Sequence, residues 1–130
     1  MKARVMVIAA VALALLACVA GCGGPAPGVV RAAAAATGGD PVRGRVLIRQ
    51  YGCVSCHTVP GVPGAHSIVG PPLAGFASRT YVAGIMANRP ENVMRWIQNP
   101  PGIDTLTAMP NVGVTEQDAR DITGYLYTLR

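Results

Sequence analysis

The sequence reads Cys-Val-Ser-Cys-His from Cys53 to His57. Two thiols three residues apart can each form a thioether with a vinyl group of a porphyrin, and the residue after the second thiol can present an imidazole to the iron. The spacing of Cys53, Cys56 and His57 therefore predicts one covalently attached haem c, with His57 as an axial ligand.

A Cys-x-x-Cys pair also occurs in zinc sites and in redox-active dithiols. Zinc is disfavoured because the sequence from Cys22 onward has no second Cys pair and no spaced His pair. A thioredoxin-like dithiol would need a βαβ context, of which the sequence gives no sign. A periplasmic dithiol without haem stays open as an alternative.

The N-terminus has the features of a secretory signal. Lys2 and Arg4 precede an apolar run over 5–20, which is shorter than the about 20 apolar residues of a membrane-spanning helix. The run is followed by Gly and then Cys22, and this end resembles a bacterial lipobox. Residues 1–21 are therefore predicted to be a signal peptide, cleaved before a lipidated Cys22. An ordinary signal peptide, in which Cys22 is incidental, is the alternative.

The segment after the predicted cleavage site is rich in Gly, Pro and Ala and carries one charge, Arg31. It has no periodic apolar face, and its Ala run at 32–36 is too short to hold a helix alone. The sequence therefore predicts a flexible linker over 22–39 and a single domain over 40–130.

The predicted domain is poor in aromatic residues, since the whole sequence has one Phe, one Trp and four Tyr. A chain of this size has a marginal core, to which a large apolar macrocycle would contribute. Beyond the predicted signal peptide, nine Arg stand against six acidic residues, a formal charge of +3. A nucleic-acid-binding domain would show a basic stripe and a higher charge density, so that class is excluded.

Start and stop signals predict three helices in the domain. Asp40 and Pro41 suit the N-cap and first turn of a helix over 40–51. Proline signals bound a second helix over 90–99, and Thr115 caps a third with an apolar face. The connectors between them are long and rich in Gly and Pro, which is unusual unless they wrap a flat cofactor. The expected fold class is a small all-α domain.

Several short motifs follow one another along the domain: the helix with Gly44, the Cys-x-x-Cys-His stretch, Gly70-Pro71-Pro72-Leu73, Gly75-Phe76, Arg79, Pro90-Glu91-Asn92-Val93, Trp96-Ile97-Gln98-Asn99-Pro100, Ala108-Met109-Pro110 and Gly124-Tyr125-Leu126. In this order they resemble a class I c-type cytochrome, of the small bacterial kind that serves terminal oxidases or is fused to them. The resemblance implies helices and long loops wrapped around one haem. It also implies that the helix with Gly44 crosses the last helix near Gly124 or Tyr125.

The resemblance implies roles for three residues around the haem. The carbonyl of Pro71 is expected to hold the imidazole of His57, because a metal-ligating His is normally oriented by an acceptor at its other nitrogen. Arg79 is expected to hydrogen-bond an inner haem propionate. Trp96 is expected to pack on the haem beside the distal ligand.

The distal ligand must be sought among Met86, Met94, Met109 and His66. Met94 falls on the apolar face of a predicted helix, where Met is usually core, and Met86 lies in a loop without support from the resemblance. His66 lies in the connector after His57 and is expected to be exposed. Met109 lies in a proline-flanked stretch and at the family position, so it is the expected ligand.

Two axial ligands from the chain would leave no open position on the iron, so we expect an electron carrier and not an enzyme. The expected donor is a quinol-oxidising complex or a dehydrogenase, and the expected acceptor is a terminal oxidase of a respiratory chain. The protein is expected to be a monomer, held on the periplasmic side of a bacterial membrane by Cys22. The alternatives are a subunit fixed in a larger complex, and a haem sensor or enzyme with a labile Met109.

Overall fold

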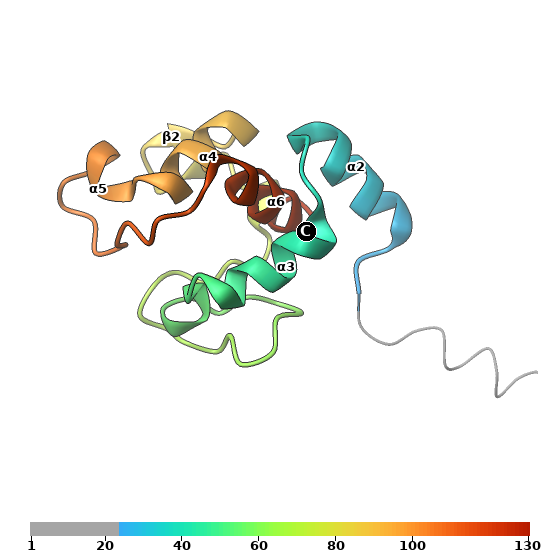
Figure 1. The fold of residues 1–130 in the computed structure, drawn as a ribbon, viewed down its shortest axis with the longest axis horizontal. Helices are drawn as coiled ribbons and strands as arrows, with labels where there is room; N and C mark the ends of the chain where they lie inside the picture. Colours follow the sequence, from blue (N-terminus) through green and yellow to red (C-terminus); the bar gives the residue numbers. More distant parts are fainter. Residues whose placement is uncertain (1–23) are drawn as a thin grey trace, which may run out of the picture.

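A computed structural model describes residues 24–130 of the chain (Figure 1). The predicted signal peptide and Cys22 lie outside the described residues. The described chain is mostly helical, and its elements are α2 (Pro27–Thr37), α3 (Pro41–Gln50), the 3₁₀ turns η2 (Cys53–Ser55) and η3 (Phe76–Ser78), β1 (Tyr81–Val82), β2 (Met86–Ala87), α4 (Pro90–Gln98), α5 (Pro100–Ile103) and α6 (Glu116–Leu126). None of the helices within residues 24–130 combines the length and the apolar character that crossing a membrane requires.

The three predicted helices are confirmed: α3 and α6 begin with a side-chain cap, and α4 begins with Pro90. The Asp40 side chain accepts hydrogen bonds from the amides of Val42 and Arg43 at the start of α3. The Thr115 hydroxyl accepts from the amide of Asp118 at the start of α6. The one-turn helix α5, the two 3₁₀ turns and the antiparallel hairpin of β1 and β2, each strand only two residues long, were not predicted.

The prediction of a flexible linker over the whole of 22–39 is wrong for α2. This helix begins with Pro27 and ends at Gly38, which adopts the left-handed conformation that favours glycine. Ala33 and Thr37 are buried where α2 packs against α6. An Ala-rich segment that is marginal alone is therefore held as a helix by tertiary contacts.

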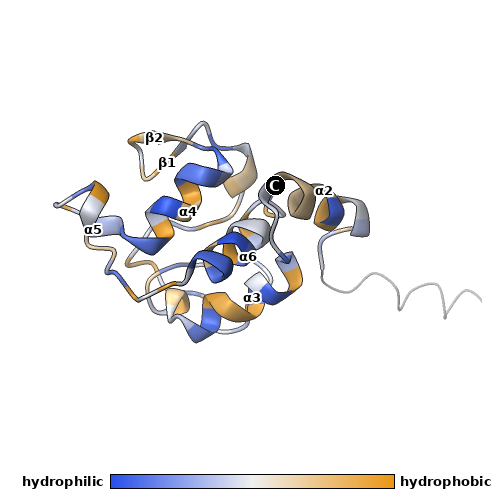
Figure 2. Cartoon of the chain, turned by 45° about the horizontal axis from the view of Figure 1, so that its top comes forward, coloured by the Kyte–Doolittle hydropathy of each residue, from blue (hydrophilic) through white to orange (hydrophobic). Residues whose placement is uncertain are grey.

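The core forms where α3 and α4 pack against α6 (Figures 1 and 2). Gly44 makes the close crossing of α3 and α6 possible, because a Cβ at this position would clash with the backbone carbonyl of Asp121. The predicted crossing near Gly124 or Tyr125 is therefore displaced by one turn of α6. Gly124 also lies against α3, at its first residue Pro41, and against Thr37 of α2.

A polar network joins α3 to α6 beside this crossing. Arg43 forms ion pairs with Asp118 and with the buried Asp121, and Asp121 also accepts a hydrogen bond of 2.8 Å from the amide of Asp40. The Tyr51 hydroxyl donates to Asp118 over 2.6 Å. This hydrogen bond from Tyr51, together with that from Arg43, holds the pKa of Asp118 below its ordinary value.

Gly44→Ala is expected to lower the free energy of unfolding by about 3 kcal/mol, at the upper end of the cost of overpacking, because the clash is with backbone and not with a flexible side chain. Gly28→Ala in α2 is the matched control, since a Cβ there meets no atom within 4 Å and favours the helix. Urea unfolding measures both variants. Equal stability of the two would contradict the proposed crossing.

Candidate functional site

A cavity of about 530 Å³ opens into the middle of the domain. Its floor comes from α3, α4 and α6, and its walls come from both long connectors and from the β1–β2 hairpin. Most of the lining is apolar, with Ile48, Val82, Val93, Ile97, Ile122 and Leu126 among it. The volume and the apolar lining are those of a small-molecule or cofactor site.

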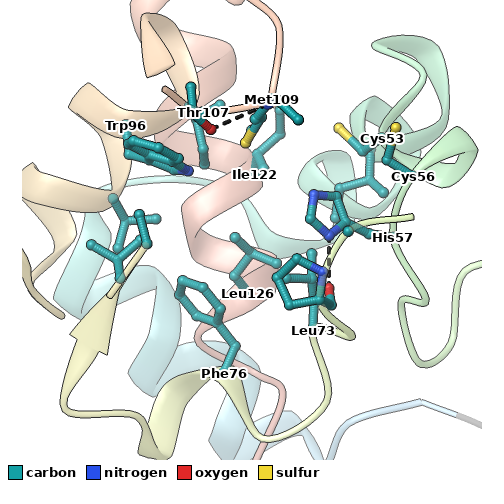
Figure 3. Close-up of a pocket in the computed structure, with 18 of the residues that line it drawn as sticks. Cys53, Cys56, His57, Leu73, Phe76, Trp96, Thr107, Met109, Ile122 and Leu126 are labelled. Carbon is teal, nitrogen blue, oxygen red and sulfur yellow. Dashed lines mark hydrogen bonds between the residues drawn. The ribbon is translucent and has the colours of Figure 1, made fainter. Parts of the chain in front are cut away.

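Cys53, Cys56 and His57 lie together on one side of the cavity (Figure 3). Gly52, with a φ of 73°, turns the chain out of α3 and into η2, which carries the first thiol. The amide of His57 donates to the carbonyl of Cys53 over 2.9 Å, so thiol and imidazole are fixed by the same tight turn. Burial raises the pKa of the Cys53 thiol.

Both thiols are free. The described part of the chain holds no group of three His, Cys, Asp or Glu side chains that could bind a metal ion. The neighbouring residues therefore give no support to the hypothesis that Cys53 and Cys56 bind zinc, because a structural zinc ion takes four such ligands.

Pro71 orients the imidazole of His57. Nδ1 of His57 lies 2.7 Å from the Pro71 carbonyl oxygen, and because a carbonyl can only accept, Nδ1 carries the proton and Nε2 is left as the acceptor nitrogen. Gly70 permits this contact, since a Cβ there would lie 2.6 Å from Cε1 of His57. The Gly-Pro motif thus positions the ring and fixes its tautomer.

Met109 borders the cavity from the connector between α5 and α6, and Figure 3 shows its side chain between Trp96 and the two thiols. The Thr107 hydroxyl accepts a hydrogen bond of 3.2 Å from the amide of Met109 and so shapes this stretch. Among the three methionines that the structure describes, Met86 and Met94 pack against the core and do not line the cavity. His66 is exposed and lies outside the cavity lining.

Arg79 and Trp96 also border the cavity. The Arg79 guanidinium donates to the carbonyls of Pro72 and Ala74 and lies 5.5 Å from the centre of the Phe76 ring, so it is held at the edge of the cavity. Trp96 lies on the same side as Met109 (Figure 3). The structure brings these two predicted residues to the site together with Cys53, Cys56, His57, Pro71 and Met109.

Three contributors were missed in the sequence. Tyr51 lines the cavity while its hydroxyl binds Asp118 on α6, and the β1–β2 turn adds Ala83 and Gly84 to the wall. Thr107, which caps the amide of Met109, is the third. It is the one whose role could have been predicted locally, because a hydroxyl residue two positions before Met109 can accept from its amide. The other contacts join residues far apart in sequence.

The family model "Cytochrome c" matches residues 41–130, which is more than half of the chain. The chain belongs to the cytochrome c family. The small, mostly helical domain agrees with this assignment, and α2 lies before the part that the family model matches. The resemblance inferred from the ordered motifs is thereby confirmed.

The cytochrome c domain is similar to parts of larger proteins. It is 30% identical over 89 residues to "Cytochrome c oxidase subunit 2" of Alkalihalophilus pseudofirmus, a match that covers 68% of this chain and 25% of the relative. It is 34% identical over 83 residues to the protein of the same name from Bacillus subtilis, covering 59% of this chain and 23% of the relative. The chain thus corresponds to about a quarter of the length of these relatives.

The family implies a haem c cofactor, and the cavity fits one. Its apolar lining suits a macrocycle, the thiols of Cys53 and Cys56 reach it from one side, and the backbone at Gly70 lies directly against the imidazole of His57. The donor set of one imidazole and one thioether is a known pair for haem iron.

Proposed function

We propose that this cytochrome c domain is a membrane-tethered one-electron carrier. The observation that carries the proposal is a single apolar cavity whose lining includes both thiols, the oriented imidazole of His57 and the thioether of Met109. A haem bound there supplies the change between Fe(III) and Fe(II), which requires no bond to a substrate.

The residues of the site have distinct roles in this proposal. Cys53 and Cys56 would hold the haem through thioethers, and His57 would bind the iron through Nε2, because Nδ1 is committed to Pro71. Met109 would supply the other iron ligand. With both ligands supplied by the chain, dioxygen and other small substrates would have no place to bind, so the proposed role is that of a carrier and not of an enzyme.

The remaining polar groups tune the site. Arg79, already at the cavity edge, has donors beyond those used on Pro72 and Ala74 and can pair with a haem propionate. Trp96 supplies apolar surface to the wall of the cavity that Met109 also borders. A soft thioether favours Fe(II), so the proposed ligand pair gives a higher reduction potential than two imidazoles would.

The proposed acceptor is a terminal oxidase, and the proposed donor is a quinol-oxidising complex or a dehydrogenase. The similarity to oxidase subunits supports the acceptor, because those relatives are named as parts of an oxidase. The same similarity supports a location at the extracytoplasmic face of a membrane, where Cys22 would provide the anchor. Encounters with such partners bury little surface and are brief.

A second candidate is a cytochrome subunit held permanently in an oxidase complex, which the names of the relatives favour. The two candidates differ in one observable. A fixed subunit purifies from detergent-solubilised membranes with other chains in constant ratio, whereas a tethered carrier separates from them.

Carbon monoxide tests the proposed function. The reduced protein at neutral pH is expected not to bind it, because Met109 and His57 occupy both axial positions. The absorption spectrum before and after exposure to the gas measures binding. A stable carbon monoxide complex would favour a sensor or an enzyme with a labile Met109 over the carrier.

Cys22→Ala is expected to move the protein from the membrane to the soluble fraction, because Ala cannot carry the proposed lipid. Fractionation of cells followed by detection of the haem measures this shift. Membrane association of the variant that persists after a wash with high salt, which weakens contacts with charged headgroups, would point to an uncleaved N-terminal anchor instead of a lipid on Cys22.

A further inference from the structure

The ordered helix α2 shortens the connection between the domain and the proposed anchor. Only four residues separate Cys22 from Pro27, where α2 begins. Five Cα–Cα steps span at most about 17 Å when fully extended. Because α2 is docked on α6 through Ala33 and Thr37, the helix cannot add to this reach without losing its packing. A lipid on Cys22 would therefore hold the domain close to the bilayer.

The outer face of α3 combines exposed apolar and basic side chains. Val42 and Val46 are 68% and 53% exposed, which is high for valines. Arg45 and Arg49 follow at positions that share this face of the helix, and both are exposed. We call these four residues, Val42, Arg45, Val46 and Arg49, the α3 outer face. Basic and apolar residues on one helix face are typical of a surface that lies on a membrane.

The charge of the α3 outer face is not neutralised within the described chain. Arg43 turns inward to Asp118 and Asp121, whereas Arg45 and Arg49 donate to the carbonyls of Gly61 and Pro63, each over 2.6 Å. Neither Arg45 nor Arg49 forms an ion pair with any residue that the structure describes. The sequence from 41 to 90 contains no Asp and no Glu, so the connector beside this face adds no negative charge.

We propose that the α3 outer face rests on the anionic headgroups of the membrane to which Cys22 is anchored, an inference that depends on the proposed lipid tether. In Figures 1 and 2 the chain enters α2 at the end of the molecule where α3 begins, far from α5. The short tether therefore joins the domain near the start of α3, the end of the helix that carries Val42. The arginines pair with lipid phosphates, and the two valines enter the boundary between headgroups and acyl chains.

This orientation has a consequence for the haem site. Ile48 and Tyr51, on the inner side of α3 and at its end, line the cavity, so a single helix of about 10 Å diameter separates the site from the lipid surface. The β1–β2 turn and the connector carrying Met109, which also line the cavity, belong to other parts of the chain than α3. A redox partner embedded in the same membrane would meet the carrier near the bilayer surface.

Vesicle binding tests the α3 outer face without the anchor. The haem-loaded Cys22→Ser protein, purified from whichever cell fraction holds it, is mixed with vesicles of phosphatidylglycerol and phosphatidylcholine in equal parts, or of phosphatidylcholine alone. It is expected to sediment with the anionic vesicles, and salt is expected to weaken this binding. The double substitution Arg45→Gln with Arg49→Gln is expected to weaken binding at least tenfold, since each Arg near an anionic surface contributes separately.

The controls separate charge at this face from charge in general. Gln keeps an amide that can still donate to the carbonyls of Gly61 and Pro63, and an unchanged haem spectrum verifies the fold. Arg89→Gln with Arg95→Gln removes the same charge from exposed positions at α4, outside any ion pair of the described residues, and is expected to leave binding within about twofold. Arg45→Lys with Arg49→Lys keeps the charge and is expected to restore binding.

Four outcomes would overturn the proposal. The first two are no binding to either kind of vesicle and equal binding to both kinds. The third is an equal loss of binding for the two Gln pairs, and the fourth is full vesicle binding by the Arg45→Gln with Arg49→Gln protein combined with slower reduction of its acceptor. The last outcome would assign this face to an acidic protein partner. None of them touches the carrier function, which the carbon monoxide experiment tests, or the anchor, which the fractionation of the Cys22→Ala protein tests.

Discussion

Met109→Leu is expected to lower the reduction potential of the haem by on the order of a few tenths of a volt, because axial ligands set haem potentials over a range of about 0.8 V. Leu has nearly the volume of Met but no sulfur, so the change isolates the thioether from the packing of the site. The reduced variant is also expected to bind carbon monoxide. Redox titration followed by absorption spectroscopy measures the first effect.

Met94→Leu is the matched control for this prediction. Met94 packs against the core from α4 and does not line the cavity, so the same substitution there is expected to leave the potential and the spectrum unchanged. If Met109→Leu behaves like Met94→Leu, then Met109 is not the axial ligand and the distal side of the site must be reassigned.

Replacing both Cys53 and Cys56 by Ser is expected to abolish covalent haem. Ser cannot form the thioether bridges, and the two thiols of this site have no described substitute, since the structure describes no further cysteine. Without the haem, the apolar walls of the cavity of about 530 Å³ would no longer be packed, which is unfavourable for the fold. Haem staining after a denaturing gel is expected to give no signal for this variant, and its steady-state level in cells is expected to fall.

Ser55→Ala is the control for the cysteine variant, because Ser55 lies between the two thiols but is exposed and contributes no side chain to the cavity. It is expected to carry covalent haem at the level of the unaltered protein. Covalent haem in the double Ser variant would contradict the attachment through Cys53 and Cys56.

The parts of the fold that could be predicted are those with local causes. Asp40, Pro90 and Thr115 start helices because a cap or a proline acts within one turn, and the structure has helices starting at each of these points. The failure at α2 has the opposite cause. Its burial depends on Ala33 meeting α6, a contact with a segment far along the chain that no local pattern encodes.

The site divides in the same way. The spacing of Cys53, Cys56 and His57 and the Gly-Pro motif at Pro71 are short patterns, and the structure brings all four residues to one side of the cavity. The bond between Tyr51 and Asp118 joins residues that are 67 positions apart, so it follows from the crossing of α3 and α6 and not from either sequence segment. The wall formed by the β1–β2 turn could not be predicted either, because strands of two residues are too short to show the alternating pattern by which strands are found in a sequence.

Intact-mass spectrometry of the mature protein under denaturing conditions tests the central claim most directly, because only a covalent haem survives unfolding of the chain. The protein, produced in a host that matures c-type cytochromes, is expected to have the mass of the chain from Cys22 onward, plus one haem, plus the acyl groups on Cys22. A mass equal to that of the polypeptide without haem would contradict the account.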